Sequence, residues 1–308
     1  MPERRAFCTT LSFRRRFDIL RRMELFLGMD GGGTGCRAAI ADGAGRVLGR
    51  GEGGAANIWS DREGALRSIL AAAGAAATAA GAEPARLTAV LGLAGANMSG
   101  ARAGLGARLP FASVRIETDA LVALKGALGA EDGIAVTLGT GSVFGLQHGG
   151  AASFFGGWGF LLGDQGGGAR IGRALLERAL LAHDGFAATT PLLAATLAAR
   201  GGPEGIVAFG RKAAPADFAR EVPRVLGADA AGDPGARAIL AEAEAAVALA
   251  IDRLAARDAP GGEALPICFL GGLGTEFARR LGPRYPGRLR PPRGSGLDGA
   301  LAMARGVA

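Results

Sequence analysis

Cysteine, histidine and lysine are scarce in this chain of 308 residues, which has three cysteines and two histidines. The cysteines are scattered and odd in number, which argues against a secreted disulfide scaffold and fits a reducing, cytoplasmic compartment. No C-x-x-C or H-E-x-x-H pattern occurs, so the common zinc sites are excluded. Neither Lys125 nor Lys212 stands in a Gly-Lys-Ser/Thr sequence, so a Walker A loop is absent as well.

Positive charge is concentrated at one end of the chain. The formal net charge is +7, but residues 1–22 alone carry +5 through seven arginines, which leaves +2 for the other 286 residues. Because the net charge of these 286 residues is so small, there is no reason to expect a nucleic-acid partner. We expect residues 1–22 to be a disordered basic extension, because a convincing strand begins directly after Met23.

A membrane-spanning segment is not expected either. The stretch 133–163 has no charged side chain, but ten of its 31 residues are glycine and polar residues interrupt the remainder. A lipid-facing helix is not built in this way. We therefore expect no membrane partner.

Glycine is abundant, with 54 residues, and it separates short apolar stretches from helical ones. Each half of the chain opens with a strand, a glycine turn and a second strand, and helices and further strands follow. This order predicts an α/β fold of two domains with a cleft between them. We place the domains at residues 23–118 and 119–308, and we expect the last helix, from about Gly296, to pack back on the first domain. The expected strands are Leu25–Met29, Cys36–Ala41, Arg46–Arg50, Leu87–Leu93, Val114–Glu117, Ile134–Leu138, Val143–Gln147 and Ile267–Leu270.

The first glycine turn follows a buried strand that ends at Asp30. Gly31, Gly32 and Gly33 let backbone N–H groups approach an anion, and Thr34 adds a hydroxyl donor. Asp30 is able to orient Mg²⁺ through water, since magnesium gives up its water reluctantly. A tight hairpin that merely needs glycine is the alternative. An acid followed by three glycines and a threonine favours phosphate binding.

The second glycine turn, Leu138-Gly139-Thr140-Gly141-Ser142, again places hydroxyls between glycines. Alone it is a weak signal. In a strand–turn–strand context like that of the first turn, it predicts the opposite half of a phosphate clamp.

Asp119 follows a short strand and opens a helix. An N-cap is the common use of such an aspartate. A general base is a second use, and the two are compatible, because a helix N-terminus favours the ionised carboxylate.

Two further segments suit ligands. In residues 156–172, Trp158 could cover the C–H face of a sugar while Asp164 accepts hydroxyl protons; a core tryptophan and a capping aspartate are the alternative. In residues 269–277, a strand, a glycine turn and a helix offer bare backbone to a nucleoside, with Gly294-Ser295-Gly296 as a second surface. An ordinary strand-to-helix connection is the alternative there.

From about Leu25 to Ala304, this ordered set of motifs resembles the sugar kinases of the actin-like ATPase superfamily, and within them the glucosamine and N-acetylglucosamine kinases. The resemblance implies a two-domain actin-like (ribonuclease H-like) fold that binds ATP, Mg²⁺ and an amino sugar. It implies that Asp119 takes the proton from the sugar 6-hydroxyl. The residues it implies are Gly31, Gly32, Gly33, Thr34, Gly139, Thr140 and Gly141 for the ATP phosphates, Gly271, Gly272 and Gly274 for adenosine, Asn57, Trp59, Asp119, Ser142, Gly157, Trp158 and Asp164 for the sugar, and Asp30 for magnesium.

The choice of sugar stays open within this resemblance. Gly35 and Arg37 differ from the residues that relatives often carry there. LLAHDG at 180–185 and the stretch 212–234 look most like bacterial glucosamine kinases, whereas Trp59 and Trp158 look more like the N-acetylglucosamine enzymes. The extent of resemblance favours glucosamine. The sequence does not reveal the oligomeric state, and a homodimer is kept open.

Two other classes of function are weighed against the kinase. An ATPase activator of a partner acyl-CoA reductase or dehydratase has the same superfamily domain, but it carries an iron–sulfur cluster, and Cys36 and Cys268 show no suitable pairing for one. A sugar-sensing repressor needs a helix-turn-helix, for which 22 residues are too few.

Overall fold

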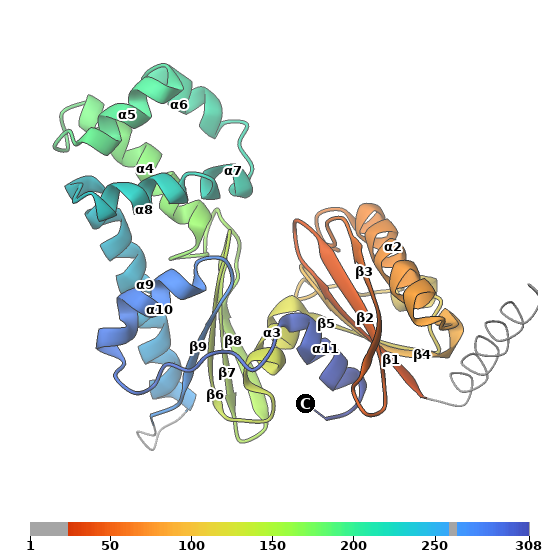
Figure 1. Ribbon diagram of the computed structural model, residues 1–308. Coiled ribbons are helices and arrows are strands. Elements are labelled where there is room, and N and C mark those ends of the chain that lie inside the picture. Colours follow the sequence, from red (N-terminus) through yellow and green to blue (C-terminus); the bar gives the residue numbers. More distant parts are fainter. Residues whose placement is uncertain (1–23, 259–263, 308) are drawn as a thin grey trace, which may run out of the picture. The chain divides into compact units, whose positions relative to one another are not determined.

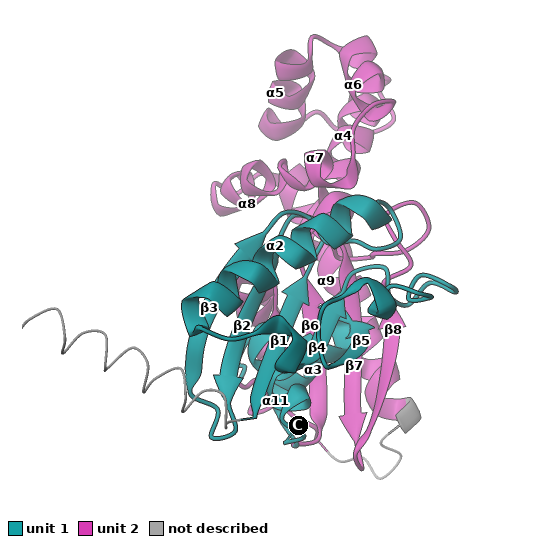
Figure 2. Cartoon of the chain, turned by 90° about the vertical axis from the view of Figure 1, so that its right-hand side faces the viewer, with its two compact units in different colours: residues 1–130, 292–308 teal, residues 131–291 magenta. Residues whose placement is uncertain are grey.

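The computed structural model describes residues 24–258 and 264–307, so the basic extension lies outside the described residues. The chain forms two compact units, shown in different colours in Figure 2. Of the described residues, unit 1 comprises 24–130 and 292–307, and unit 2 comprises 131–258 and 264–291.

Unit 1 is built on a five-stranded sheet of strand order β3-β2-β1-β4-β5. Strand β1 (Leu25–Gly31) lies at its centre, between β2 (Cys36–Asp42) and β4 (Leu87–Leu93), and β3 (Val47–Gly53) and β5 (Ser113–Thr118) form the edges. Strands β1, β2 and β3 pair antiparallel, whereas β4 and β5 run parallel to β1. The carboxyl ends of β1, β4 and β5 therefore meet at one edge of the sheet.

Helices cover both faces of this sheet (Figure 1). On one face, α2 (Arg62–Ala80) packs on Leu27 and Met29; it begins at the N-cap Asp61 and ends at Gly81 in the left-handed conformation. On the other face lie α3 (Asp119–Leu128) and α11 (Gly296–Ala304). Because side chains alternate along β1, Gly28 faces α11, where an added Cβ would lie 2.5 Å from the backbone N of Leu301. Glycine thus lets α11 lie directly against the central strand.

Unit 2 has a four-stranded sheet of order β8-β7-β6-β9. Strands β6 (Gly133–Leu138), β7 (Ser142–His148) and β8 (Ala151–Gly156) form an antiparallel meander, and β9 (Ile267–Leu270) runs parallel to β6. Strand β8 is not expected from the sequence. It is an edge strand without a buried residue, so it lacks the apolar alternation that marks a strand.

Most of the helical content of unit 2 follows this meander. The helices are α4 (Gly168–His183), α5 (Pro191–Arg200), α6 (Pro203–Gly210), α7 (Pro215–Ala219), α8 (Val222–Ala230), α9 (Pro234–Asp258) and α10 (Gly274–Leu281). The largest core cluster joins β6 and β7 to α4, α9 and α10. Among the described residues, no helix combines the length and the apolar character needed to cross a membrane.

The α/β class with two sheets is confirmed. The compact units divide the chain after Ala130, and α3 packs on α11 and β4. The expected domain boundary between residues 118 and 119 stays a prediction. Helix α11 belongs to unit 1. The use of these units as functional domains, and a cleft between them, stay predictions.

Candidate functional site

In unit 1, three segments are joined by hydrogen bonds at the carboxyl edge of the parallel strands. Ala94, which follows β4, donates its backbone N–H to the carbonyl of Gly31 at 2.8 Å and accepts from Ile58 at 3.0 Å. The N–H of Ala56 donates to the carbonyl of Gly32 at 2.9 Å. The glycine turn, the segment after β3 and the segment after β4 thus form one hydrogen-bonded edge.

The glycine turn connects β1 to β2 and is bracketed by an ion pair. Asp30 and Arg37 are directly paired in the antiparallel register, so their side chains lie on the same face. The guanidinium of Arg37 donates to Asp30 Oδ2 at 3.0 Å. Asp30 also lies against the start of α11, where a Cβ on Gly296 would be 3.0 Å from its carboxyl carbon. The 294–296 segment, expected to serve a nucleoside, is therefore beside Asp30.

Packing explains only one of the turn's three consecutive glycines. A Cβ on Gly31 would lie 2.8 Å from Leu93 Cδ2 and 2.9 Å from Ala56 Cβ. A Cβ on Gly33 would meet nothing within 4 Å, and none of the turn's glycines has a positive φ. Within the described residues, the backbone N–H groups of Gly33 and Thr34 make no hydrogen bond, and both residues are exposed. These features fit close approach by an anion.

Asp119 follows β5 at the same edge, and it is the first residue of α3 rather than its N-cap. Thr118 is the N-cap, with its hydroxyl accepting from Leu121 N–H at 3.1 Å. The capping use predicted for Asp119 is therefore wrong. Its carboxylate accepts from the adjacent Ala120 N–H at 2.9 Å.

The environment of Asp119 makes it a stronger base than an ordinary aspartate. Burial raises the pKa of its carboxyl, and the negative charge of Asp30 raises this pKa further, although backbone N–H groups act in the opposite direction. The helix N-terminus was expected to favour ionisation, but loss of solvation is the larger effect. A carboxylate with a raised pKa is suited to taking a proton.

Asn57 and Trp59, expected to bind sugar, lie in the segment after β3. The side-chain oxygen of Asn57 accepts from the backbone N–H of Trp59 at 3.0 Å and of Ser60 at 3.1 Å, which fixes the local turn. Gly95, with φ +79°, leaves room for Asn57 Oδ1. The Trp59 side chain is exposed, at 58%. An exposed indole on an ordered turn suits stacking on a ligand.

In unit 2, the turn between β6 and β7 is tied to the start of α4. Gly168 and Ala169 donate their N–H groups to the carbonyls of Gly139 and Thr140 at 2.8 and 2.9 Å. The Ser142 hydroxyl donates to the carbonyl of Gln165 at 2.8 Å. A Cβ on Gly139 would meet nothing within 4 Å. This turn therefore has the same open space as the turn in unit 1, on a fixed backbone.

Asp164 is buried beside this turn and has φ +58°, the sole positive φ of a non-glycine residue in the described ranges. Burial raises the pKa of its carboxyl, while hydrogen bonds from the backbone N–H groups of Gly159 and Ser142 and the charge of Arg170 act to lower it. A Cβ on Gly141 would collide with this carboxylate. Asp164 therefore fixes the turn, and it is not the helix cap considered from the sequence, since Gly167 is the N-cap of α4.

Trp158 is also not a core residue, because 76% of its side chain is exposed. It follows Gly156 and Gly157, which have φ values of +73° and +68°. The flanking Leu161 and Leu162 are exposed as well. This segment presents exposed apolar side chains, and its contact with a sugar stays a prediction.

The segment expected to bind adenosine connects β9 to α10. Gly271 has φ +82°, and a Cβ there would collide with the carbonyl of Leu138, to which Leu273 donates at 3.0 Å. A Cβ on Gly272 would meet nothing within 4 Å, and one on Gly274 would lie 3.0 Å from the Phe269 carbonyl carbon. The segment is thereby hydrogen-bonded to the end of β6, directly before the second glycine turn.

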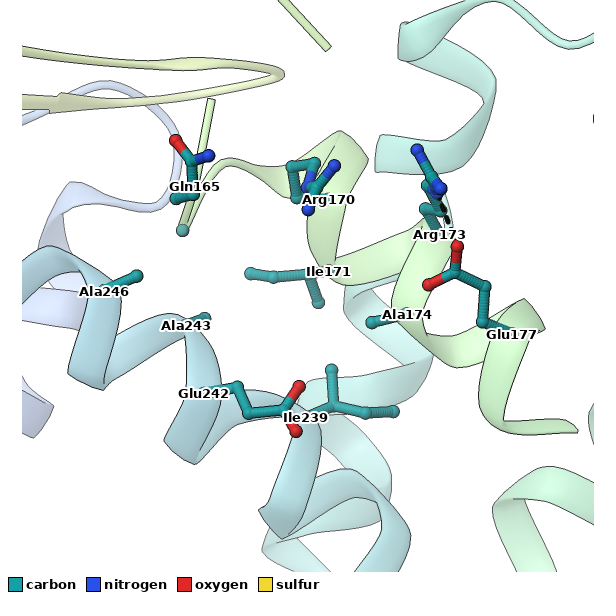
Figure 3. Close-up of a pocket in the computed structure, with 11 residues that line it drawn as sticks. Gln165, Arg170, Ile171, Arg173, Ala174, Glu177, Ile239, Glu242, Ala243 and Ala246 are labelled. Atoms are coloured by element: carbon teal, nitrogen blue, oxygen red, sulfur yellow. Dashed lines mark hydrogen bonds and ion pairs between the residues drawn. The ribbon is translucent and has the colours of Figure 1, made fainter. Parts of the chain in front are cut away.

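A small pocket of about 170 Å³ lies between α4 and α9 (Figure 3). Gln165 and Gly166, the two residues after Asp164, contribute to its wall. Arg173 points to Glu177, with a 2.6 Å ion pair, and Glu242 pairs with Arg178 of α4. The charged residues that line the pocket are thus ion-paired, except for Arg170, whose positive charge lowers the pKa of Asp164.

Metal-binding side chains are sparse. The described residues contain no group of three or more His, Cys, Asp or Glu side chains able to hold an ion. Asp30, partly exposed beside the glycine turn, fits a magnesium ion that keeps most of its water and is held chiefly by phosphate oxygens.

The two mixed sheets define the fold of the actin-like sugar kinases and ATPases. A ROK family glucokinase from Streptomyces griseus, solved with glucose and AMPPNP, shares this fold over 92% of this chain and 99% of its own, with a TM-score of 0.55 and 22% identity. The chain belongs to the BadF/BadG/BcrA/BcrD ATPase family, whose model matches residues 27–281. Membership of an ATPase family implies the use of ATP.

Two relatives with higher sequence identity are named as kinases of amino sugars. The chain is 34% identical over 287 residues to glucosamine kinase GspK of Vibrio cholerae, which covers 92% of this chain and 96% of that protein. A crystal structure from Chromobacterium violaceum, assigned provisionally as an N-acetylglucosamine kinase, is 33% identical with a TM-score of 0.82, and covers 92% of this chain and 99% of its own.

The contact of Arg37 with Asp30 is not among the site features expected from the sequence, where Arg37 stands only as a departure from relatives. The hairpin register was the signal that could have found it. Residues at equal distances from the centre of a two-stranded turn pair directly and share a face.

Proposed function

We propose that the protein is an ATP-dependent amino-sugar kinase that transfers the γ-phosphate of ATP to the 6-hydroxyl of its substrate, with glucosamine preferred over N-acetylglucosamine. The observation that carries the proposal is the placement of Asp119 at the same sheet edge as the open glycine turn of Asp30. Similarity to a glucosamine kinase over nearly the whole of both chains supports the choice of substrate class.

In this proposal Asp119 accepts the proton of the sugar hydroxyl as the hydroxyl oxygen attacks phosphorus. Its raised pKa suits this task, since a base works best when its pKa approaches the operating pH. The free N–H groups of Gly33 and Thr34 hold phosphate oxygens. Asp30 orients a hydrated magnesium ion, which supplies charge neutralisation when bound.

The other residues predicted for the site bind the remaining parts of the substrates. Gly139, Thr140 and Gly141 contact phosphate, and Gly271, Gly272 and Gly274 lie against adenosine. The residues proposed for the sugar are Asn57, Trp59, Ser142, Gly157, Trp158 and Asp164. Phosphoryl transfer needs chiefly positioning and neutralisation of charge, and ordered glycine turns provide both.

An ATPase activator of a partner reductase or dehydratase is the alternative, because the matched family is defined as an ATPase family and its description prints no sugar substrate. Cys36 and Cys268 do not support it. Both are buried, and burial raises the pKa of each thiol, whereas cluster ligands are thiolates. A colourless, iron-free protein with sugar-dependent activity would count against the activator.

A coupled assay of ADP release tests the kinase. Glucosamine, N-acetylglucosamine, glucose and N-acetylmannosamine are compared, and the phosphorylated product is identified by mass spectrometry. We expect the highest kcat/KM with glucosamine and no phosphorylation of 6-deoxyglucosamine. If none of the sugars raised the rate of ADP release above the rate without sugar, the proposal would be contradicted. Phosphorylation of the 6-deoxy sugar would contradict the assignment of the 6-hydroxyl. Cytoplasmic location and a homodimer stay predictions.

A further inference from the structure

We propose that Arg37 binds the terminal phosphate of ATP, and that its ion pair with Asp30 is the resting position from which it turns to that phosphate. The inference rests on the proposed function, because it takes the glycine turn to be the phosphate site.

Geometry places Arg37 at the mouth of the turn. Asp30 and Arg37 are the facing residues of β1 and β2, one register position outside the pair Gly31 and Cys36 that closes the hairpin. Their side chains lie on the same face and meet at 3.0 Å. An anion held by the free N–H groups of Gly33 and Thr34 therefore lies within the reach of a long, flexible arginine side chain.

Arg37 is free to leave its partner. Its side chain is 59% exposed, and Asp30 Oδ2 is the partner it contacts among the described residues. An exposed ion pair of this kind is worth only about 0–1 kcal/mol. Moving the guanidinium to a phosphate exchanges one charge-assisted hydrogen bond for two, because arginine and phosphate match as a fork.

The other arginines near this edge have other partners. Arg102 donates to the carbonyls of Ala96 and Ile116, at 2.8 and 2.7 Å, and Arg108 pairs with Glu63. Neither is paired in the register with a residue of the turn. Arg37 is therefore the cation that the fold supplies next to the free N–H groups.

The position of Asp119 indicates that the phosphate bound by Arg37 is the terminal one. Asp30 lies at the carboxyl end of β1 and Asp119 directly follows β5, so both lie at the same edge of the unit 1 sheet. The acceptor hydroxyl must lie at Asp119, and the phosphorus it attacks must lie next to it. The phosphate beside Asp30 and Arg37 is thus the transferred one, where an arginine neutralises the charge of the transition state.

The experiment compares equilibrium binding of ADP and of a non-hydrolysable ATP analogue, by calorimetry with magnesium present, in wild type, Arg37→Gln and Arg37→Lys. We expect Arg37→Gln to weaken analogue binding by roughly tenfold or more, as for the loss of a charged hydrogen bond, and ADP binding by less than about threefold. Arg37→Lys recovers part of the difference, because an ammonium donates without the fork. In turnover, kcat falls by roughly 10³-fold for Arg37→Gln.

The matched control is Arg46→Gln, which removes an exposed arginine paired with Asp42 at 3.1 Å in the next hairpin of the same sheet. It should leave both nucleotide affinities and kcat unchanged. Equal weakening of ADP and analogue by Arg37→Gln would overturn the inference, since it would mean that Arg37 only orders Asp30. Unchanged analogue affinity and kcat would overturn it too.

These outcomes are separate from the fate of the proposed function. Nucleotide binding is measured without sugar. A wild-type protein that binds the analogue through Arg37 but phosphorylates no sugar refutes the kinase and leaves this inference standing. A sugar kinase whose Arg37→Gln variant is normal refutes only this inference.

Discussion

Two hairpin turns at opposite ends of the unit 1 sheet have the same pair of residue types and different surroundings. The β1–β2 turn runs from Asp30 to Arg37, and the β2–β3 turn from Asp42 to Arg46. In each, an arginine is ion-paired to the aspartate, at 3.0 and 3.1 Å.

The second turn is closed by the protein itself. Asp42 is buried, and its carboxylate accepts from the backbone N–H of Arg46 at 2.9 Å, which holds its pKa below the usual range. Gly45, with φ +87°, donates to the carbonyl of Asp42, and Arg305 of the C-terminal segment donates to the carbonyl of Gly43. The aspartate, the arginine and Gly45 of this turn are therefore explained by contacts within the protein.

The first turn leaves its donors open. Gly33 and Thr34 have N–H groups without a partner in the described residues, and Gly33 is not required by packing or by φ. The comparison teaches that an Asp/Arg pair around glycines is not a functional signal by itself. The signal is the set of polar groups that the fold orders and does not satisfy.

The largest effect on activity is expected from Asp119, at the sheet edge that carries the first glycine turn. Asp119→Asn should lower kcat by roughly two to four powers of ten, since an amide accepts no proton. Thermal stability should stay the same or rise, because an ionised carboxylate with a raised pKa weakens the fold at neutral pH. Steady-state kinetics and a melting curve measure both.

Glu117→Gln is the matched control for this variant. It changes a carboxylate of β5 that is ion-paired with Arg102 and Arg115 and has no role in the proposed proton transfer. We expect near-normal kcat from it. If Asp119→Asn kept normal turnover, Asp119 would have no role in proton transfer.

Alanine substitutions in the two turns give the next effect. Gly33→Ala and Gly43→Ala each add a Cβ that meets nothing within 4 Å at a residue without positive φ, so both should melt at or slightly above the wild-type temperature. Only Gly33→Ala should raise the KM for ATP, by roughly ten- to a hundredfold, because its Cβ would occupy the position proposed for the phosphate. Equal KM values in the two variants would show that the first turn is structural like the second.

The pH dependence of kcat/KM should report Asp119. The carboxylate is the active form, so kcat/KM falls about tenfold for each pH unit below its pKa. Because burial and the charge of Asp30 raise that pKa, the fall should begin at a higher pH than the ordinary aspartate value of 3.8 predicts. A rate that stays flat down to that value would contradict the raised pKa.

The smallest effect on activity is expected at the closed turn. Asp42→Asn should leave kcat within about twofold but lower the melting temperature at neutral pH by roughly 3 °C, through weaker acceptance from Arg46. Since the folded-state pKa of Asp42 is lowered, its stabilisation is present above the unfolded value of 3.8 and is lost as the pH falls through the folded value. The difference in melting temperature should therefore disappear in acid.

The sequence predicted those parts of the fold whose signals are local. Strand β4 was expected at Leu87–Leu93 and is found there, and the starts of β1 and α3 were also correct. Strand β8 was missed because an exposed edge strand lacks the apolar pattern. The cap of α3 was assigned to Asp119 instead of Thr118, since both residue types cap helices and only the backbone distinguishes them.

The candidate site divides in the same way. Its glycine turns could be read from the chain because they are contiguous. The contact of Gly296 with Asp30, the electrostatic coupling of Asp119 to Asp30, and the left-handed backbone of Asp164 depend on chain segments brought together by folding. No local pattern encodes these, so they required coordinates.

The position of α11 has a consequence for how the protein is made. This helix lies against Gly28 and Asp30 of the central strand, yet it is translated only after all of unit 2. On the ribosome, β1 therefore lacks its packing partner until α11 has been translated. We expect that unit 1 does not complete its folding before unit 2 has been made, although domains usually fold in the order of their synthesis. Nascent-chain proteolysis at successive lengths should show protection of unit 1 arriving late and abruptly.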